Sequence, residues 1–175
     1  MTSHKSNQGF SLIELLLVVA IIGIIAAIAI PNLLSSRRAA NEASGLATIR
    51  IISSGEATYQ ATAGAGSYGD LAALRNNSLV DQAVGAATIA GPGTAKTGYL
   101  FSAENITGTG GPAFDAKAQP SVHTSASLLF STGSRSFFVN ESGVVYFNTT
   151  DTAPTCAATT ARPVTPGVGG GPLNN

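Results

Sequence analysis

The chain has 175 residues, a length that suits one modest globular domain and an additional segment. Nine basic and nine acidic residues give a formal net charge of zero, so no basic surface dense enough for nucleic acid as the main partner is expected. The single cysteine, Cys156, excludes an intramolecular disulfide.

A polar leader precedes the first apolar segment. Residues 1–9 include Lys5 and no acid, and they end in Gly9, where an apolar run begins. The apolar region of a secretory signal peptide is about 7 to 15 residues long and ends in an A-x-A-like site. Because this run is longer and its sharpest junction lies before it, we expect the run to be retained. Its removal at the small residues Ala27–Ala29 is the alternative.

The apolar run extends from Phe10 to Ile30, and Glu14 is its only ionisable side chain. As a helix with a rise of about 1.5 Å per residue it spans roughly 31 Å, which matches a hydrocarbon core of about 30 Å. It is therefore predicted to cross a membrane. Pro31 follows, but residues 32–63 are rich in Ala, Leu, Ile and Arg and contain no other proline. We expect a kink or local melting at Pro31 and then more helix.

The second half of this helix is predicted to carry one narrow stripe of small residues, interrupted by Arg50. We expect the stripe to face inward, against a sheet or another helix, because small side chains permit close approach. The stripe consists of Ala39, Ala43, Leu46, Ser53 and Ala57.

A small head with an antiparallel sheet is predicted after the helix. Gly64, Gly66 and Gly69 break the helix, and a loop with one helical turn at Leu71–Arg75 follows. Gly143 supplies the positive φ that a short hairpin turn requires. Four segments rich in aromatic or β-branched residues are strand candidates: Tyr99–Ala103, Ala126–Ser131, Ser136–Asn140 and Val144–Asn148. The predicted fold class is α+β, with a long N-terminal helix packed on a small antiparallel sheet.

The C-terminal segment, residues 149–175, contains several prolines and the run Gly169–Gly171. Such a composition cannot bury a core, so we expect a disordered tail. The expected divisions of the chain are then 1–9, 10–30, 31–63, 64–148 and 149–175.

Glu14 is the residue that most needs a physical explanation, because an acid at the centre of a membrane-spanning helix costs about 2.5 to 3.5 kcal/mol on insertion scales. One interpretation is that Glu14 lies near the membrane interface and is tolerated there. The other gives it a cationic partner. Cleavage after Gly9 would create an α-amine on Phe10, and such amines have pKa values near 7.7 to 8.0. Our hypothesis is that this amine meets Glu14 of a neighbouring subunit on assembly and sets the register.

The sequence GFSLIE at positions 9–14, followed by an apolar helix that ends at Pro31, resembles the processing and methylation motif of type IV pilins and their pseudopilin relatives. The resemblance covers residues 8–51. It implies cleavage between Gly9 and Phe10 by prepilin peptidase, N-methylation of Phe10, and assembly into a homo-oligomeric helical filament by a dedicated ATPase and a platform protein. Pro31 would then mark the segment that melts when subunits pack.

The resemblance also implies a location. The unassembled subunit would be a single-pass protein of the bacterial inner membrane with its head in the periplasm, and the assembled filament would be periplasmic or extracellular. The head resembles the pilin family more loosely, and Cys156 alone cannot close the C-terminal disulfide loop that many pilins have.

No catalytic, cofactor or metal site is predicted. Catalysis needs convergent titratable groups, and His123, the only histidine outside the leader, is expected to be a solvated loop residue. Asp115, Glu141 and Asp151 are isolated acids without the clustered oxygen ligands that calcium requires. The chain is therefore expected not to be an enzyme.

The leading hypothesis is a structural subunit whose helices stack into a filament core while the heads form its outer surface. A pseudopilin of a type II secretion system is the nearest alternative. A monomeric membrane-anchored binding module is the alternative from a different class, and it would leave the pattern at positions 9–14 as coincidence. Adhesion, motility, DNA uptake and secretion are not distinguished by the sequence.

Overall fold

The computed structural model describes residues 10–89, 94–106, 111–123, 130–150, 152–156, 164–165 and 171–173. The expected leader, residues 1–9 with Gly9 at its end, lies outside this set. The chain divides into two compact units, Met1–Ser36 and Arg37–Asn175. We call them the N-terminal unit and the head unit, and we describe each by itself.

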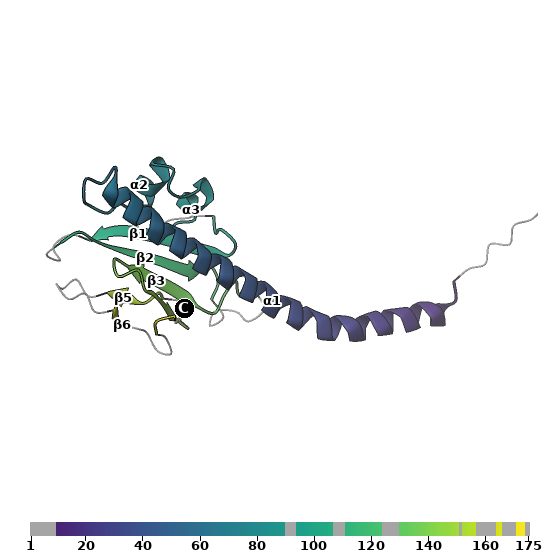
Figure 1. Ribbon diagram of the computed structural model, residues 1–175. Coiled ribbons are helices and arrows are strands. Elements are labelled where there is room, and N and C mark those ends of the chain that lie inside the picture. The colour runs from purple at the N-terminus through teal and green to yellow at the C-terminus, as the bar shows by residue number, and fades with distance from the viewer. Residues whose placement is uncertain are drawn as a thin grey trace, which may run out of the picture. The chain divides into compact units, whose positions relative to one another are not determined.

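Helix α1, Leu12–Ala61, is 50 residues long and contributes to both units (Figure 1). Its first half is dominated by Leu, Ile and Ala. Pro31 lies inside α1, so the helix continues past this proline as the sequence predicts. The sequence left a kink or local melting open at Pro31; the backbone is helical there, so local melting is not seen in the subunit.

The end of α1 is set by glycines. The amide of Gly64 donates to the Tyr59 carbonyl at 2.7 Å, and the amide of Gly66 donates to the Gln60 carbonyl at 3.0 Å. Gly66 has a φ of 93°, a conformation in which a side chain would be strained. These contacts satisfy carbonyl groups of the last helical turn and stop the helix at Ala61.

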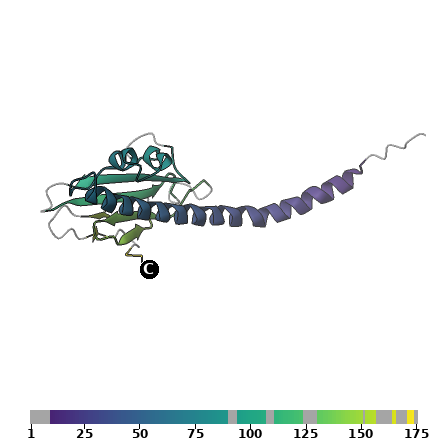
Figure 2. The same ribbon diagram turned by 45° about the horizontal axis from the view of Figure 1, so that its top comes forward.

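The head unit contains a four-stranded antiparallel sheet in the order β1-β2-β3-β4. The second half of α1 crosses one face of this sheet (Figures 1 and 2). The α+β fold class predicted from the sequence is therefore confirmed. The strands are β1 (Tyr99–Ile106), β2 (Ala113–Pro120), β3 (Ser136–Asn140) and β4 (Val145–Asn148).

The second strand is not where the sequence pattern places it. The predicted strand Ala126–Ser131 falls partly outside the described residues, and its described positions, Phe130 and Ser131, are not in a strand. Residues 113–120 form β2 instead. This segment is rich in Ala and contains Asp115 and Lys117, residue types with low strand propensity. Its pairing with β1 and β3 and the burial of most of its residues override that propensity.

The hairpin between β3 and β4 matches the sequence prediction. Gly143 has a φ of 72°, and its amide donates to the Asn140 carbonyl at 2.9 Å. Asn140 Oδ1 also accepts from the amide and the hydroxyl of Ser142, at 3.1 Å and 2.6 Å. The asparagine side chain thus holds the turn closed from inside.

Two short helices follow α1, and an aspartate caps each of them. Asp70 precedes α2 (Leu71–Asn76) and accepts from the Ala73 amide at 2.7 Å. Asp81 precedes α3 (Gln82–Ala86) and accepts from the Val84 amide at 2.7 Å. The sequence predicts a helical turn at the position of α2, whereas α3 is too short to show an apolar period.

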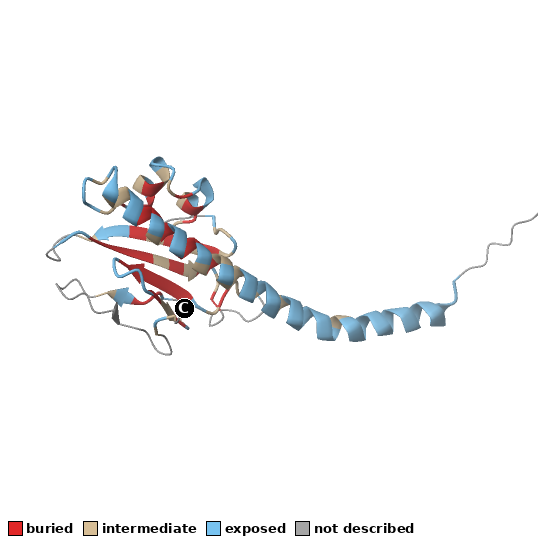
Figure 3. Cartoon of the chain, viewed as in Figure 1, coloured by how far each residue is buried: buried red, intermediate tan, exposed pale blue. Residues whose placement is uncertain are grey.

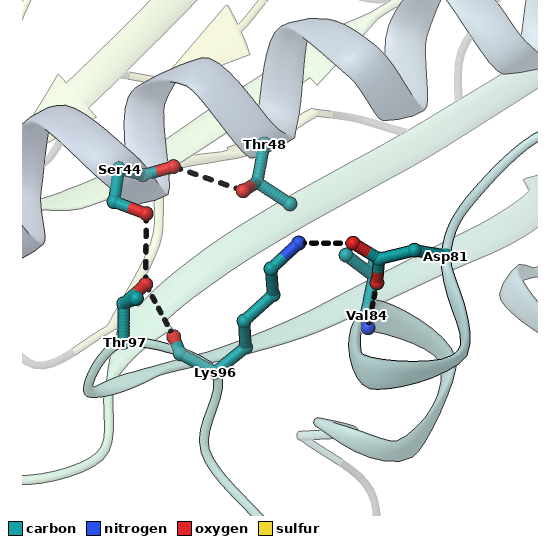
Figure 4. A network of polar contacts seen from close by, with 6 residues as sticks. All are labelled: Ser44, Thr48, Asp81, Val84, Lys96 and Thr97. Atoms are coloured by element: carbon teal, nitrogen blue, oxygen red, sulfur yellow. Dashed lines mark hydrogen bonds and ion pairs between the residues drawn. The ribbon is translucent and has the colours of Figure 1, made fainter.

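Asp81 also ties α3 to the start of the sheet. Lys96 donates to its other oxygen at 2.5 Å (Figure 4). The hydrogen bond from Lys96, followed by that from the Val84 amide, lowers the pKa of Asp81. Next to Lys96, the hydroxyl of Thr97 lies 2.8 Å from the Ser44 hydroxyl, which joins the same strand start to α1.

The core of the head unit is built from large side chains of α1 and the sheet. Ile49 and Ile52 of α1 are fully buried, as are Tyr99 and Phe101 of β1. A Cβ at Gly45 would lie 3.0 Å from the Tyr99 ring, so the absence of a side chain there lets the ring approach the helix. Burial of each such large side chain contributes about 1.5 to 3 kcal/mol.

The prediction of an inward stripe of small residues was wrong. In the structure Ala39, Ala43 and Ala57 are exposed, and Leu46 and Ser53 are only partly buried. The buried face of α1 is a different one. An isoleucine removes more apolar surface from water than an alanine does, so the face that contains Ile49 and Ile52 packs on the sheet.

The C-terminal segment has structure in its described parts, which corrects the expected disorder there. Strand β5 (Thr155–Cys156) pairs antiparallel with β6 (Val164–Thr165). The carbonyl of Gly171 accepts from the Phe147 amide at 3.0 Å, and the Leu173 amide donates to the Val145 carbonyl at 2.9 Å. Residues 171–173 therefore cover the outer edge of β4. Backbone pairing, which composition does not report, fixes them.

Candidate functional site

Residues 12–30 of α1 present an apolar surface in which Glu14 is the one ionisable side chain. Within α1 the structure has one segment that is long and apolar enough to cross a membrane, and none of that segment is buried. Figure 3 shows this part of the helix exposed along almost its whole length. A soluble monomer rarely exposes a contiguous apolar patch of more than a few hundred Å², so lipid or another protein is expected to cover this one. Its large exposed residues are Phe10, Leu12, Ile13, Leu15, Leu16, Leu17, Val18, Val19, Ile21, Ile22, Ile24, Ile25, Ile28, Ile30 and Leu33.

Phe10 lies two residues before the first residue of α1, and Glu14 lies two residues after it. The side chain of Phe10 is 80% exposed. Glu14 is an exposed acid in the first helical turn. A negative side chain at this end of a helix interacts favourably with the helix dipole. The position of Glu14 thus has a local electrostatic advantage that the sequence argument missed, in addition to any partner it acquires.

Pro31, the third predicted assembly residue, is exposed in the middle of α1. Phe10, just before α1, and Glu14 and Pro31 within it are therefore spread along the chain rather than gathered in a pocket. This arrangement fits residues that act between molecules, because each is open to a neighbour. It does not fit a catalytic centre, in which reacting groups must converge.

Glu56 is a buried acid that sequence reasoning missed. It lies on the buried face of α1 and is 0% exposed. Its Oε2 accepts a hydrogen bond from the Gly69 amide at 2.9 Å, while Oε1 is buried without a hydrogen-bond partner among the described residues. Burial raises the pKa of Glu56 to about 7 against the lowering effect of the Gly69 bond. Glu56 therefore anchors the loop after α1 with a carboxyl group that titrates near neutrality.

Glu42 anchors a second loop to α1. Its Oε1 accepts from the amide and the hydroxyl of Ser134, at 2.7 Å and 2.6 Å. The guanidinium of Arg135 lies 3.9 Å from Oε2. Two charge-assisted hydrogen bonds to one oxygen hold the segment before β3 on the helix. Glu42 gives no sequence signal for this role, because its partners are more than ninety residues away in the chain.

His123 differs from the prediction of a solvated residue. It is 5% exposed, and its Nε2 lies 3.0 Å from the Ser134 carbonyl. It also forms a β-bridge with Gly133. Pairing of residues 121–123 with the segment before β3 encloses the ring, so this histidine is a structural residue. Among the residues described here, no group of three His, Cys, Asp or Glu side chains is placed to hold a metal ion.

Comparison with known proteins gives matches in the N-terminal region. Residues 4–30 match the family model described as the prokaryotic N-terminal methylation motif. Over 38 residues the chain is 58% identical to the type IV wide pilus major component PilA4 of Thermus thermophilus. The aligned part is 22% of this chain and 29% of that protein, so the chain spans less than a third of the curated relative it matches. No solved structure matches the chain.

The fold and these matches point to the same class of protein. A long N-terminal helix packed on a four-stranded antiparallel sheet is a pilin-like arrangement, and the methylation motif begins before that helix. Together with the PilA4 match, the methylation motif shows that the N-terminal region of this chain is similar to that of type IV pilins, the region that carries the resemblance.

Proposed function

We propose that the chain is a structural subunit that polymerises through its N-terminal helix into a type IV pilus-like filament. One observation carries the proposal: the whole apolar half of α1 is unburied in a chain whose head has a core of its own. Such a surface is stable only in lipid or against other copies of the same surface. When the subunit leaves the membrane and enters a filament, the lipid around its apolar helix is replaced by the apolar helices of other subunits.

Processing prepares this exchange. Prepilin peptidase removes residues 1–9 by cutting between Gly9 and Phe10, and N-methylation of the new Phe10 amine follows. Support comes from the methylation motif that matches residues 4–30. The cut places a positive amine at the end of an otherwise apolar segment whose only charge is Glu14. The amine of one subunit then pairs with Glu14 of another.

The pairing gives assembly its register. Two charges in an apolar surrounding are costly unless they are paired, so only staggers that bring amine and carboxylate together are favoured. Each contact joins different patches of two identical chains, and repetition of such a heterologous contact produces an open helix. Pro31 removes one helical hydrogen bond and is the point where α1 can open locally as the subunits pack.

The proposed partners follow from this cycle. Before assembly the subunit spans the bacterial inner membrane through residues 10–30 with its head in the periplasm, and prepilin peptidase is its first partner. An assembly ATPase and a platform protein then drive it into the filament. The role is mechanical, and no enzymatic step is assigned to the chain.

The proposal predicts that surface fibres contain the chain along their length. Antibodies against the head unit are applied to fibres sheared from cells that express the protein and are viewed by electron microscopy. We expect regular labelling along the fibres, and none on fibres from cells that lack the gene. Unlabelled fibres from cells in which the chain stays in the membrane fraction would contradict a filament role.

A further inference from the structure

The loop before β3 is fixed to the first turns of α1 within the head unit. Three side chains of α1 form hydrogen bonds with three closely spaced residues of this loop, so α1 holds the loop in its conformation. The bonds join Arg38 Nη1 to the Ser131 hydroxyl (3.2 Å), Asn41 Nδ2 to the Thr132 carbonyl (3.0 Å) and Glu42 Oε1 to the Ser134 amide (2.7 Å).

Phe130 lies at the described start of this loop and is 78% exposed. Among the large apolar side chains described for the head unit, Ile51 and Val144 are also exposed, at 52% and 38%. Phe130 adjoins Ser131, which Arg38 holds, so an exposed aromatic ring and a guanidinium are kept on the same part of the surface. Arg37 is exposed next to Arg38 in the chain.

These residues are close along the chain to the membrane-spanning segment. Arg37 follows Ile30 by 37 − 30 = 7 residues, and α1 is helical throughout that interval. At about 1.5 Å per residue this is roughly 10 Å of helix. The polar headgroup regions extend a bilayer from about 30 Å to 40–45 Å, so they add several Å on each side. The added layer is about 5 to 7.5 Å on each side, so Arg37 and Arg38 lie a few Å beyond it when residues 10–30 span the bilayer. Long arginine side chains, which tilt toward the N-terminal end of a helix, span that gap to the lipid phosphates.

We propose that Arg37, Arg38 and Phe130, together called the Phe130 surface, bind an anionic phospholipid surface while the subunit is anchored in the membrane. Segments that bind at a membrane surface place Trp, Phe and Leu at the boundary between headgroups and acyl chains, where an exposed ring such as that of Phe130 is removed from water. Guanidinium groups bind phosphate oxygens through paired N–H donors. The inference rests on the proposed membrane anchoring of residues 10–30.

This contact would hold the head at one depth above the bilayer before polymerisation. The hydrogen bonds of Asn41 and Glu42 fix the loop that includes Phe130 to α1. A loop held at the membrane surface would therefore also hold this part of α1 at a fixed distance from the bilayer. The apolar half of α1 would then lie at the same depth in the bilayer in every subunit before the subunit contacts its neighbour in the filament. Assembly then exchanges lipid at the Phe130 surface for neighbouring subunits.

The experiment uses tryptophan fluorescence, because the natural chain contains no tryptophan. Three single-tryptophan variants of the full chain, Ile21→Trp, Phe130→Trp and Val144→Trp, are reconstituted in vesicles of phosphatidylglycerol and phosphatidylcholine. Part of the lipid carries bromine, which quenches nearby tryptophan. The bromine lies near the headgroup end of the acyl chains in the vesicles used for Phe130→Trp and Val144→Trp, and near the methyl end in those used for Ile21→Trp, because Ile21 is at the middle of the span. Ile21→Trp reports on anchoring, and Val144→Trp is the matched control at an exposed head position on the β3–β4 turn.

We expect loss of fluorescence for Ile21→Trp and Phe130→Trp, and none for Val144→Trp. If Ile21→Trp is quenched while Phe130→Trp behaves like Val144→Trp, the Phe130 surface does not bind lipid and only this inference is overturned. If Ile21→Trp is itself unquenched, the anchoring in the proposed function fails, and the inference fails with it.

A second arm tests the anionic headgroups. Arg37→Gln is added to Phe130→Trp, because Arg37 is exposed whereas Arg38 also holds the loop. We expect weaker quenching of this double variant than of Phe130→Trp, and weaker quenching of Phe130→Trp in phosphatidylcholine alone. Equal quenching in all these samples would overturn the assignment of anionic lipid as the partner.

Discussion

Replacement of Glu14 by valine is expected to abolish filament assembly while membrane insertion continues. The variant removes the only charge of the apolar segment, and with it the partner of the Phe10 amine in the neighbouring subunit. Insertion is expected to improve, because an acid in a membrane-spanning helix costs up to about 2.5 to 3.5 kcal/mol. Filament yield in the sheared fraction and chain content of the membrane fraction are the two measurements.

Leu16→Val is the matched control for Glu14→Val. It changes an exposed apolar residue of the same segment to another apolar residue, so it keeps both length and charge. We expect normal filaments from Leu16→Val and none from Glu14→Val, with both chains in the membrane. Filaments of normal yield from Glu14→Val would show that the carboxylate is merely tolerated near the interface.

The second large effect concerns pH and Glu56. The pKa of this carboxyl group is raised from 4.5 to about 7 by burial, so the folded chain binds the proton more tightly than the unfolded chain does. Below pH 4.5 the group is protonated in both states and costs nothing. As pH rises from 4.5 to 7 the unfolded chain releases this proton while the folded chain keeps it, so stability falls. Above pH 7 the loss is complete, at about 3 kcal/mol from 1.36 kcal/mol per pKa unit.

Glu56→Gln is expected to remove most of this pH dependence. The amide keeps an oxygen that can accept from the Gly69 amide but never ionises, so the variant should be more stable than the natural chain at pH 8 and similar at pH 4. Urea unfolding of the full chain in detergent at both pH values measures the difference. Glu104→Gln, at an exposed position of β1, is the control and should change little. A natural chain equally stable at pH 4 and pH 8 would contradict the role given to Glu56.

The helix and much of the sheet could be predicted because their signals are local. An apolar run of the length of a membrane span and a tract free of further proline predict α1 through Pro31. The aromatic segments predict β1, β3 and β4, and Gly143 predicts the hairpin turn. Each of these features is decided by a few neighbouring residues, so one sequence is enough.

The missed features depend on contacts between distant parts of the chain. Strand β2 is rich in alanine and is a strand because β1 and β3 pair with it on both sides. Ile49 and Ile52 are buried because they pack in one core with side chains of the sheet, and this packing decides which face of α1 is inward. A helical projection of the sequence contains no information about the sheet. His123 and Glu56 are buried by segments that fold over them. The local sequence predicted that His123 would be exposed, and it gave no sign that Glu56 would be buried.

The candidate site is a different case, since its residues are close in sequence but act between molecules. The motif at positions 9–14 gives the chemistry, a new amine near a single acid, and the structure adds that Glu14 occupies the first turn of an exposed helix. In the proposed filament, the partner of that acid belongs to another copy of the chain. Register between copies therefore depends on an assembly, and neither the sequence nor the subunit structure contains it.

The most direct measurement of the central claim is the mass of the N-terminal peptide from filaments sheared off cells. We expect a peptide that begins at Phe10 and carries one methyl group on its α-amine, because only this cut creates the positive charge proposed to pair with Glu14. A chain that still begins at Met1, or an unprocessed chain confined to the membrane, would contradict processing at Gly9 and the pairing that depends on it.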